Sequence, residues 1–237
     1  MFRKSLVFCS AVIALLSLSS SAFAQTADEV VAKNLAAKGG IEKLKGIQTL
    51  RQTATMSGQG QSAKMTTIAK RPNMTRQELV VNGQTIIMAF DGVNARTQNP
   101  MAGPGTMDVP AEQVEMIKDQ SDIDGPLIDY KAKGSTIELI GLETIDGKKQ
   151  FHLRVSRKAL PVQDVYLDGT TYLESKVTTT IPGSGTMETV FGDYRQVEGM
   201  TMPFSIKTMA AGMMVAELKV EKIEINVKLD DSVFKIK

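Results

Sequence analysis

From Gly46 onwards, apolar and polar residues alternate with a period of two over most of the chain. This period places successive side chains on opposite faces of a strand, whereas a helix that buries one side repeats every 3.6 residues. Turn residues separate the alternating segments, among them Asn82-Gly83, Asp91-Gly92, Asp146-Gly147 and Asp168-Gly169. Asn-Gly and Asp-Gly favour tight hairpin turns. The sequence therefore predicts a mainly β protein built from consecutive antiparallel strands.

The predicted strands form two groups, at 47–57, 63–70, 75–81, 84–91 and 93–98, and at 137–142, 148–156, 162–168, 171–180, 186–191, 202–209 and 213–227. The apolar positions of the last strand change parity. Leu218 and Val220 occupy even-numbered positions, whereas Ile223 and Ile225 occupy odd-numbered ones. One extra residue near Glu221-Lys222 would return all four side chains to one face, so we predict a β-bulge there.

Two segments break the alternation and are predicted to be helical. Residues 26–38 begin with the capping box Thr26-Ala27-Asp28-Glu29 and end at Gly39-Gly40, with a further short turn at 41–45. The second helix follows the Gly/Pro-rich loop 99–106. It is predicted to begin at Asp108-Val109-Pro110, with Pro110 in its first turn, and to end near Asp119.

A flat sheet with so many strands would expose long unpaired edges, and curling into a barrel removes most of that exposure. We therefore predict a single large, antiparallel and highly curved sheet, a half-open β-barrel. The N-terminal helix and the mid-chain helix would cover its open side, the latter as a lid. Since the sequence has no internal repeat and no low-complexity linker, residues 25–237 are predicted to form one domain.

The first 24 residues have the features of a secretory signal peptide. Arg3 and Lys4 precede the uncharged apolar run 6–18, and Ala22-Phe23-Ala24 matches the small-residue cleavage motif. An uncleaved membrane anchor is the alternative, but a span needs about 20 apolar residues. We expect cleavage after Ala24, export to the periplasm and a mature N-terminus at Gln25.

Removal of this segment changes the chemistry of the chain. It takes away the only cysteine, Cys9, and with it any disulfide, thiolate nucleophile or cysteine metal site. A lipoprotein signal is excluded, because Phe8 is too large for the position before a lipidated cysteine. Two of the 28 Lys and Arg residues are removed as well, so 26 remain against 26 Asp and Glu. A neutral chain gives no reason to expect a nucleic-acid partner, and no further apolar run is long enough for an integral membrane protein.

Few residues suggest catalysis. His152 is the only histidine and shares a strand face with Arg154. The sequence contains no G-x-S-x-G, H-E-x-x-H or Walker motif. Asp122, Asp124 and Asp129 lack the spacing of a calcium-binding loop, so we interpret them as residues that end a helix and solvate a loop. We expect no enzymatic activity, no metal and no cofactor.

Methionine is unusually frequent, with 14 residues and no Trp in the chain. Three interpretations are open. The methionines could fill irregular gaps in a core, they could line a soft apolar cavity for acyl chains, or their thioethers could bind copper(I).

Five features in a fixed order resemble the periplasmic outer-membrane lipoprotein-sorting superfamily, LolA/LolB-like. They are the signal peptide with the capped helix 26–38, Phe90-Asp91-Gly92 before Asn99-Pro100, the pair 165–168 and 171–173, the run 191–195 before 198–203, and the closing segments 226–227 and 231–234. The resemblance implies an unclosed antiparallel barrel with a helical lid that binds lipoprotein acyl chains. Two departures are that the carriers are usually shorter and use aromatic cavity residues, including Trp.

We therefore predict a periplasmic, monomeric carrier that holds a lipid or lipoprotein acyl chain, with a role in sorting to the outer membrane. Envelope membrane proteins are further candidate partners. The predicted cavity lining is Ile86, Met88, Phe90, Phe151, Leu153 and Val155, and the predicted lid residues are Met101, Met107, Met116 and Ile117. One alternative is an envelope sensor or protein-interaction module without lipid cargo. The other is a hydrolase that uses His152.

Overall fold

The computed structural model describes residues 25–181, 183 and 185–236. The predicted signal peptide lies outside the described residues. The helices are α1 (Ala27–Ala37), α2 (Ile41–Gly46), α3 (Ala111–Gln120) and the 3-10 helix η1 (Asp231–Phe234). The strands are β1 (Thr49–Gly58), β2 (Gln61–Lys70), β3 (Met74–Val81), β4 (Gln84–Phe90), β5 (Ala95–Gln98), β6 (Met107–Asp108), β7 (Ser135–Ile145), β8 (Lys148–Arg157), β9 (Gln163–Asp168), β10 (Glu174–Ile181), β11 (Gly185–Val197), β12 (Met200–Ala210) and β13 (Met213–Ile225).

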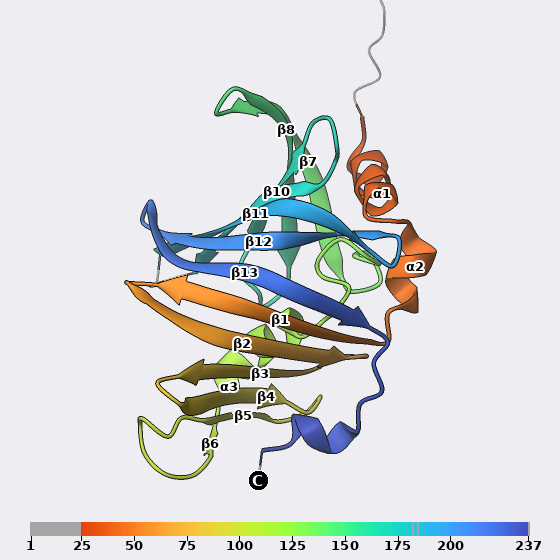
Figure 1. Cartoon of the computed structure of the whole chain (residues 1–237). Helices are drawn as coiled ribbons and strands as arrows, with labels where there is room; N and C mark the ends of the chain where they lie inside the picture. Colours follow the sequence, from red (N-terminus) through yellow and green to blue (C-terminus); the bar gives the residue numbers. More distant parts are fainter. Residues whose placement is uncertain (1–24, 182, 184, 237) are drawn as a thin grey trace, which may run out of the picture.

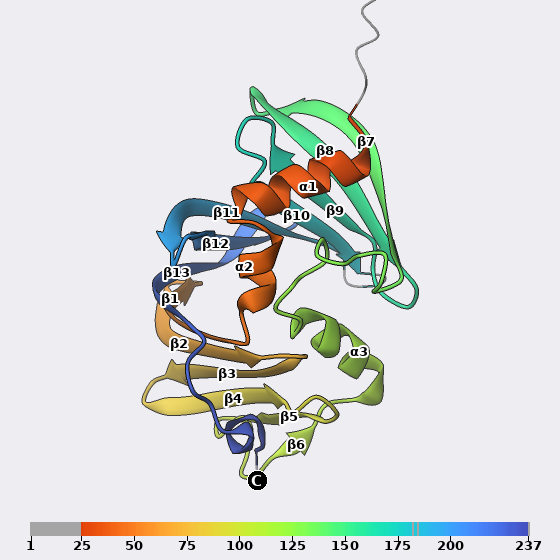
Figure 2. The same ribbon diagram turned by 90° about the vertical axis from the view of Figure 1, so that its right-hand side faces the viewer.

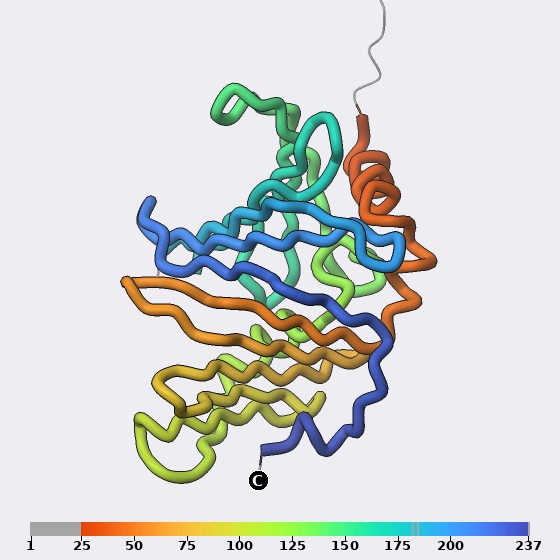
Figure 3. The backbone as a smooth tube through the Cα atoms, in the orientation of Figure 1, coloured from red at the N-terminus to blue at the C-terminus, as the bar shows by residue number. Residues whose placement is uncertain are grey.

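All the strands belong to one antiparallel sheet of 13 strands in the order β6-β5-β4-β3-β2-β1-β13-β12-β11-β10-β9-β8-β7. Pairing of β1 with β13 joins the two groups of strands that the sequence predicted. The sheet is strongly curved and twisted (Figure 1), and its strands follow one continuous surface (Figure 3). Because β6 and β7 end the strand order without pairing to each other, the barrel is not closed. The predicted half-open architecture is confirmed.

The predicted bulge in the last strand is also confirmed. Thr53 pairs with Lys222 and Ala54 pairs with Val220, so Glu221 has no partner in the register. The extra residue places apolar side chains of both parities on one face of β13, as the sequence pattern required.

The N-terminal helix begins as predicted. The Thr26 hydroxyl accepts a hydrogen bond from the Glu29 amide at 3.2 Å, and the Glu29 carboxylate accepts one from the Thr26 amide at 2.7 Å. The start of α3 differs from the prediction. Met107-Asp108 forms β6 by pairing with β5, and Val109 donates to the Ala95 carbonyl, so these residues are held in the sheet. Pro110 is consequently the N-cap of α3 and not part of its first turn.

The three α-helices lie on the face of the sheet inside its curve (Figure 2), and each packs over an apolar cluster. We call this face the inner face. The cluster under α1 contains Val30, Val31 and residues of β8 and β9, the cluster under α2 contains Leu44, Met200 and Ile225, and the cluster under α3 contains Phe90, Ala95 and Ile117.

The C-terminal tail covers part of the opposite, outer face. Phe234 and Ile236 are buried, and the carbonyls of Val233 and Ile236 accept hydrogen bonds from Arg76 and Arg96 of β3 and β5. The alternating pattern of β3 to β5 did not predict that their outer face would be covered. The C-terminal tail that covers it has no regular periodicity and so could not be recognised in the sequence.

Candidate functional site: the uncharged inner face

The inner face of β1 to β4 and β13 has no ionisable side chain within these described strands. Leu50 packs in the cluster under α2, and Met88 and Phe90 pack in the cluster under α3, which fixes the orientation of β1 and β4. The strand register then assigns the charged residues of these strands to the outer face. Lys64 and Glu221, for example, form an outer-face ion pair of 2.5 Å.

Apolar residues in direct cross-strand register form a continuous band on this inner face, which we call the apolar ladder. One series of neighbours runs through Ile86, Leu79, Met65, Ala54 and Val220, from β4 to β13. A second runs through Met56, Leu218, Ile206 and Phe191, from β1 to β11. Ala54 and Val220 are buried, whereas the other seven are half-buried. Since no helix covers them completely, they are available to a ligand.

Neutral polar residues and two shallow hollows border the apolar ladder. Gln52, Thr67 and Gln77 are cross-strand neighbours that separate the ladder from the helices. A hollow of about 200 Å³ lies at the α2 end, and its apolar lining includes Leu44 and Met202. A second, of about 270 Å³, lies at the hairpin end of the strands, between Met56, Gly58, Ala63, Val81 and Ala216. Both hollows open on the same face, so the ladder joins them.

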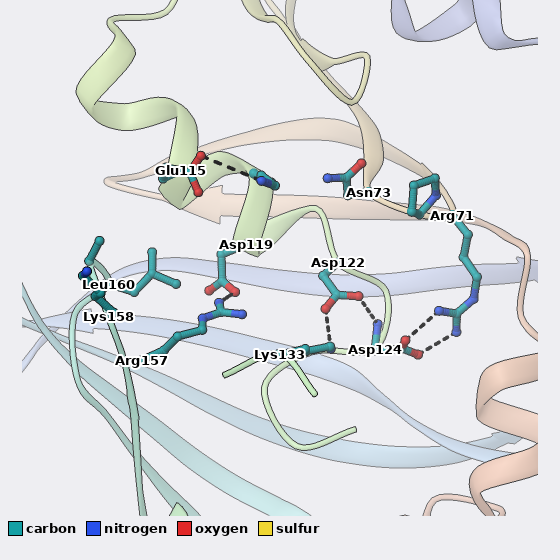
Figure 4. Close-up of a pocket in the computed structure, with 13 residues that line it drawn as sticks. Arg71, Asn73, Glu115, Asp119, Asp122, Asp124, Lys133, Arg157, Lys158 and Leu160 are labelled. Carbon is teal, nitrogen blue, oxygen red and sulfur yellow. Dashed lines mark hydrogen bonds and ion pairs between the residues drawn. The ribbon is translucent and has the colours of Figure 1, made fainter. Parts of the chain in front are cut away.

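A larger pocket of about 730 Å³ is charged. It lies between α3, the β2–β3 turn and the β8–β9 turn, as Figure 4 shows. Arg157 and Asp119 form an ion pair across it, and so do Lys133 and Asp122. The first pair attaches the end of α3 to β8, and the second joins two parts of the segment between α3 and β7. The pocket therefore borders the lid region and not the apolar ladder.

Arg71 is the most connected residue of this pocket. Its two terminal nitrogens donate to the two carboxylate oxygens of Asp124, each at 2.6 Å, and it also donates to the carbonyls of Leu44 and Ile47. Hydrogen bonding to Arg71 lowers the pKa of the Asp124 carboxyl, and Asp124 in turn raises the pKa of Arg71. One guanidinium thereby connects the β2–β3 turn, α2 and the segment after α3.

The three aspartates of that segment each pair with a different cation. Asp124 pairs with Arg71, Asp122 with Lys133, and Asp129 with Lys45 at 2.5 Å. No group of three or more His, Cys, Asp and Glu side chains suited to a metal ion occurs in residues 25–181, 183 and 185–236.

The predicted cavity residues fall into two groups on the inner face. Phe151, Leu153 and Val155 are buried beneath α1 in one cluster. Met88 and Phe90 lie under α3 in another, and Ile86 belongs to the apolar ladder. Of the predicted lid residues, Ile117 packs against this second group. Of the others, Met101 and Met107 are exposed to solvent and Met116 is half-buried.

Several ladder residues were not singled out from the sequence, namely Met65, Leu79, Ile206 and Leu218. Strand parity assigns each of these residues to one of the two faces of its strand. Only the register shows that they are neighbours across the strands.

His152 lies on the outer face, away from these groups. Its ring stacks on Tyr166 with the ring centroids 4.5 Å apart, and its two nitrogens lie 2.7 Å from Glu143 and 2.9 Å from Asp164. The side chain is buried within this network, which fixes β7, β8 and β9 to one another.

No protein-family model matches the sequence, and no curated protein matches it. Solved structures do resemble it. A DUF1329 family protein from Desulfovibrio piger aligns with a TM-score of 0.62 and 12% identity, covering 89% of this chain and 98% of that one. A LolA superfamily protein from Nitrosomonas europaea gives a TM-score of 0.58 and 13% identity, covering 90% and 99%. The chain has a LolA-like fold.

A third LolA-like structure, a putative outer membrane lipoprotein-sorting protein domain from Vibrio parahaemolyticus, gives a TM-score of 0.57 and 13% identity, covering 86% of this chain and 97% of that one. The family resemblance seen in the sequence therefore holds at the level of the fold. None of the described helices has the length and apolar character needed to span a bilayer.

Proposed function

We propose that this LolA-like protein is a non-enzymatic periplasmic carrier that holds the acyl chain of a lipid or lipoprotein against its inner face. The observation that carries the proposal is the apolar ladder, which extends across seven neighbouring strands on a face without charges in β1 to β4 and β13. The signal sequence supports export, with cleavage after Ala24, and sorting of lipoproteins to the outer membrane is the matching role.

The energetics of acyl chains require such a surface. Transfer of a chain from water costs about 0.8 kcal/mol per methylene, so a sixteen-carbon chain needs on the order of 10 kcal/mol of compensation. A single charged side chain in its path would have to be desolvated without a partner. The inner face of β1 to β4 offers only apolar and neutral polar side chains, and the charged residues of those strands form ion pairs on the outer face.

Two substitutions that differ by one position test the proposal. Met65→Glu places a carboxylate in the middle of the apolar ladder, whereas Thr66→Glu places it on the outer face of the same strand. We expect the exported wild-type protein to show bound lipid by native mass spectrometry and to take up a fluorescent fatty acid. The Met65→Glu variant should bind it at least about tenfold more weakly, and Thr66→Glu should bind like the wild type.

Equal binding by all three proteins would place the lipid elsewhere. Absence of lipid and of fatty-acid uptake in the wild type would refute the carrier function and favour a protein-interaction module. N-terminal sequencing of the exported protein tests the remaining part of the proposal, since it should begin at Gln25.

A further inference from the structure

From β6 to β10 in the strand order, the strand connections at one end of the sheet contain no charged residue. Strand directions place the β1–β2, β3–β4, β5–β6, β10–β11 and β12–β13 connections at this end. The β8–β9 connection, further along the strand order, also lies at this end, but it contains Lys158 and borders the charged pocket. In Figure 1, the β1–β2, β3–β4 and β12–β13 hairpins point to the left. Their uncharged sequence ranges are 52–63, 79–90, 97–107, 177–187 and 208–216. We call this surface the uncharged end.

Composition does not explain the pattern, because 23% of the residues in the chain are charged. Connections at the opposite end of these strands carry charges, although the β9–β10 connection, residues 169–173, does not. The β2–β3 connection contains Arg71, the β4–β5 connection Asp91, and the β11–β12 turn Glu198. In β1 to β5 and β11 to β13, charges are thus sorted between the two ends of the same strands.

The uncharged end also exposes large apolar side chains. Met213 is 68% exposed, Met214 is 51% exposed and Val80 is 43% exposed, all at or beside hairpin turns. Around them the turns contain glycine and neutral polar residues such as Asn82 and Gln59. Exposed apolar side chains among neutral polar groups suit the boundary between lipid headgroups and acyl chains, where a charge would be costly to desolvate.

We propose that the uncharged end is a membrane-docking surface that rests on a lipid bilayer, with Met213, Met214 and Val80 entering the boundary between headgroups and acyl chains. The hollow of about 270 Å³ lies at the same end and leads to the apolar ladder. An acyl chain could therefore pass between bilayer and inner face along uncharged residues. This route rests on the proposed carrier function, but the docking itself does not.

The absence of Trp from the chain gives a direct test. Met213→Trp and Val93→Trp each introduce a single fluorophore, the first at the uncharged end and the second at the opposite end, where Val93 is 75% exposed. Both are prepared as exported protein with a verified N-terminus and mixed with neutral phosphatidylcholine vesicles that carry brominated acyl chains. The Met213→Trp emission should shift to the blue and be quenched, whereas the Val93→Trp emission should stay unchanged.

Charge substitutions test the same surface in sedimentation with vesicles. The double variant Met213→Glu/Val80→Glu should partition at least about tenfold more weakly than the wild type, whereas the control Val93→Glu should partition equally. Binding should not weaken between low and high salt, because no charged residue takes part.

Several outcomes would overturn the docking proposal. They are equal quenching of both tryptophans, quenching of neither, a strong salt dependence, or sedimentation analysis showing a dimer that the double variant abolishes. Fatty-acid uptake in the absence of vesicles is measured on the same variants. Normal uptake without vesicle binding would refute docking alone, and vesicle binding without uptake would refute the carrier function alone.

Discussion

Arg71 shows how a single side chain fixes the helical cover on the sheet. Its guanidinium donates to the Asp124 carboxylate and to backbone carbonyls at the end of α2. Both partners of the ion pair are mostly buried, with side-chain exposures of 20% and 11%. Loss of one partner would leave the other charge poorly solvated, which makes this pair more important than the exposed ion pairs of the outer face.

We predict that Asp124→Asn lowers the free energy of unfolding by about 2 kcal/mol at pH 7, the range for a hydrogen bond to a charged group. The pKa of Asp124 is lowered in the folded state, so its carboxylate stabilises the fold above the unfolded-state pKa. This contribution is lost as the pH falls through the folded-state pKa. Urea unfolding at pH 7 and pH 3 should therefore show a difference between wild type and variant that shrinks with acidification. A difference in unfolding free energy that is the same at both pH values would show that the stabilisation does not come from the ionised Asp124 carboxylate.

The sequence indicated the aspartates near 122–129 but not their partners. Arg71 and Lys45 are far from Asp124 and Asp129 in sequence, and each pair forms only when the segment after α3 lies across the sheet. The same holds for His152. Its strand and its neighbour Arg154 followed from alternation, whereas its contacts with Glu143 and Asp164 depend on the register of three strands.

At the scale of elements, periodicity predicted most strands and both long helices, because each buries one face. The bulge at Glu221 followed from parity alone. β6 was not predicted, since two residues carry no detectable period, and η1 and the C-terminal tail were missed for the same reason. For the site, parity placed Ile86, Met88 and Phe90 on one face. It could not show that α1 would bury Phe151, Leu153 and Val155.

The connection between α1 and α2 offers a test of how the helices are attached. Gly39 has φ +119° and lies on the β11–β12 turn, where an added Cβ would be 2.7 Å from the Gly199 carbonyl oxygen. Gly40 has φ +93°, but an added Cβ would meet nothing within 4 Å. We predict that Gly40→Ala costs about 1–2 kcal/mol through backbone strain alone.

Gly39→Ala should cost more, at least about 3 kcal/mol, because the turn must also move. Thermal unfolding of both variants measures the difference. The Lys38 carbonyl accepts a hydrogen bond from the Thr201 amide at 3.0 Å, which should hold the α1–α2 connection against the β11–β12 turn. Equal destabilisation by the two substitutions would mean that this contact is loose.

For the whole molecule, the sheet sorts its residues in two directions. Across the thickness of β1 to β4 and β13, charges lie on the outer face and apolar residues on the inner face. Along β1 to β5 and β11 to β13, charges lie at one end and are missing from the connections at the other. An unclosed barrel makes both arrangements useful, because its inner face stays accessible from the uncharged end.

This arrangement predicts that a bound acyl chain stabilises the molecule as a whole. The apolar ladder combines residues 54–86 with residues 191–220, so it exists only in the folded state. A ligand of the ladder therefore cannot bind the unfolded chain equally well.

A fatty acid at a free concentration of 100 times its dissociation constant should add about 2.7 kcal/mol to the free energy of unfolding. For a domain of this size, that corresponds to an increase in melting temperature of roughly 5–10 °C. Scanning calorimetry with palmitate below its micelle concentration should show a shift that grows with ligand concentration in the wild type and in Thr66→Glu, and a clearly smaller shift in Met65→Glu. The same shift in all three proteins would mean that the chain is bound outside the ladder, and a shift in none would mean that the inner face holds no acyl chain.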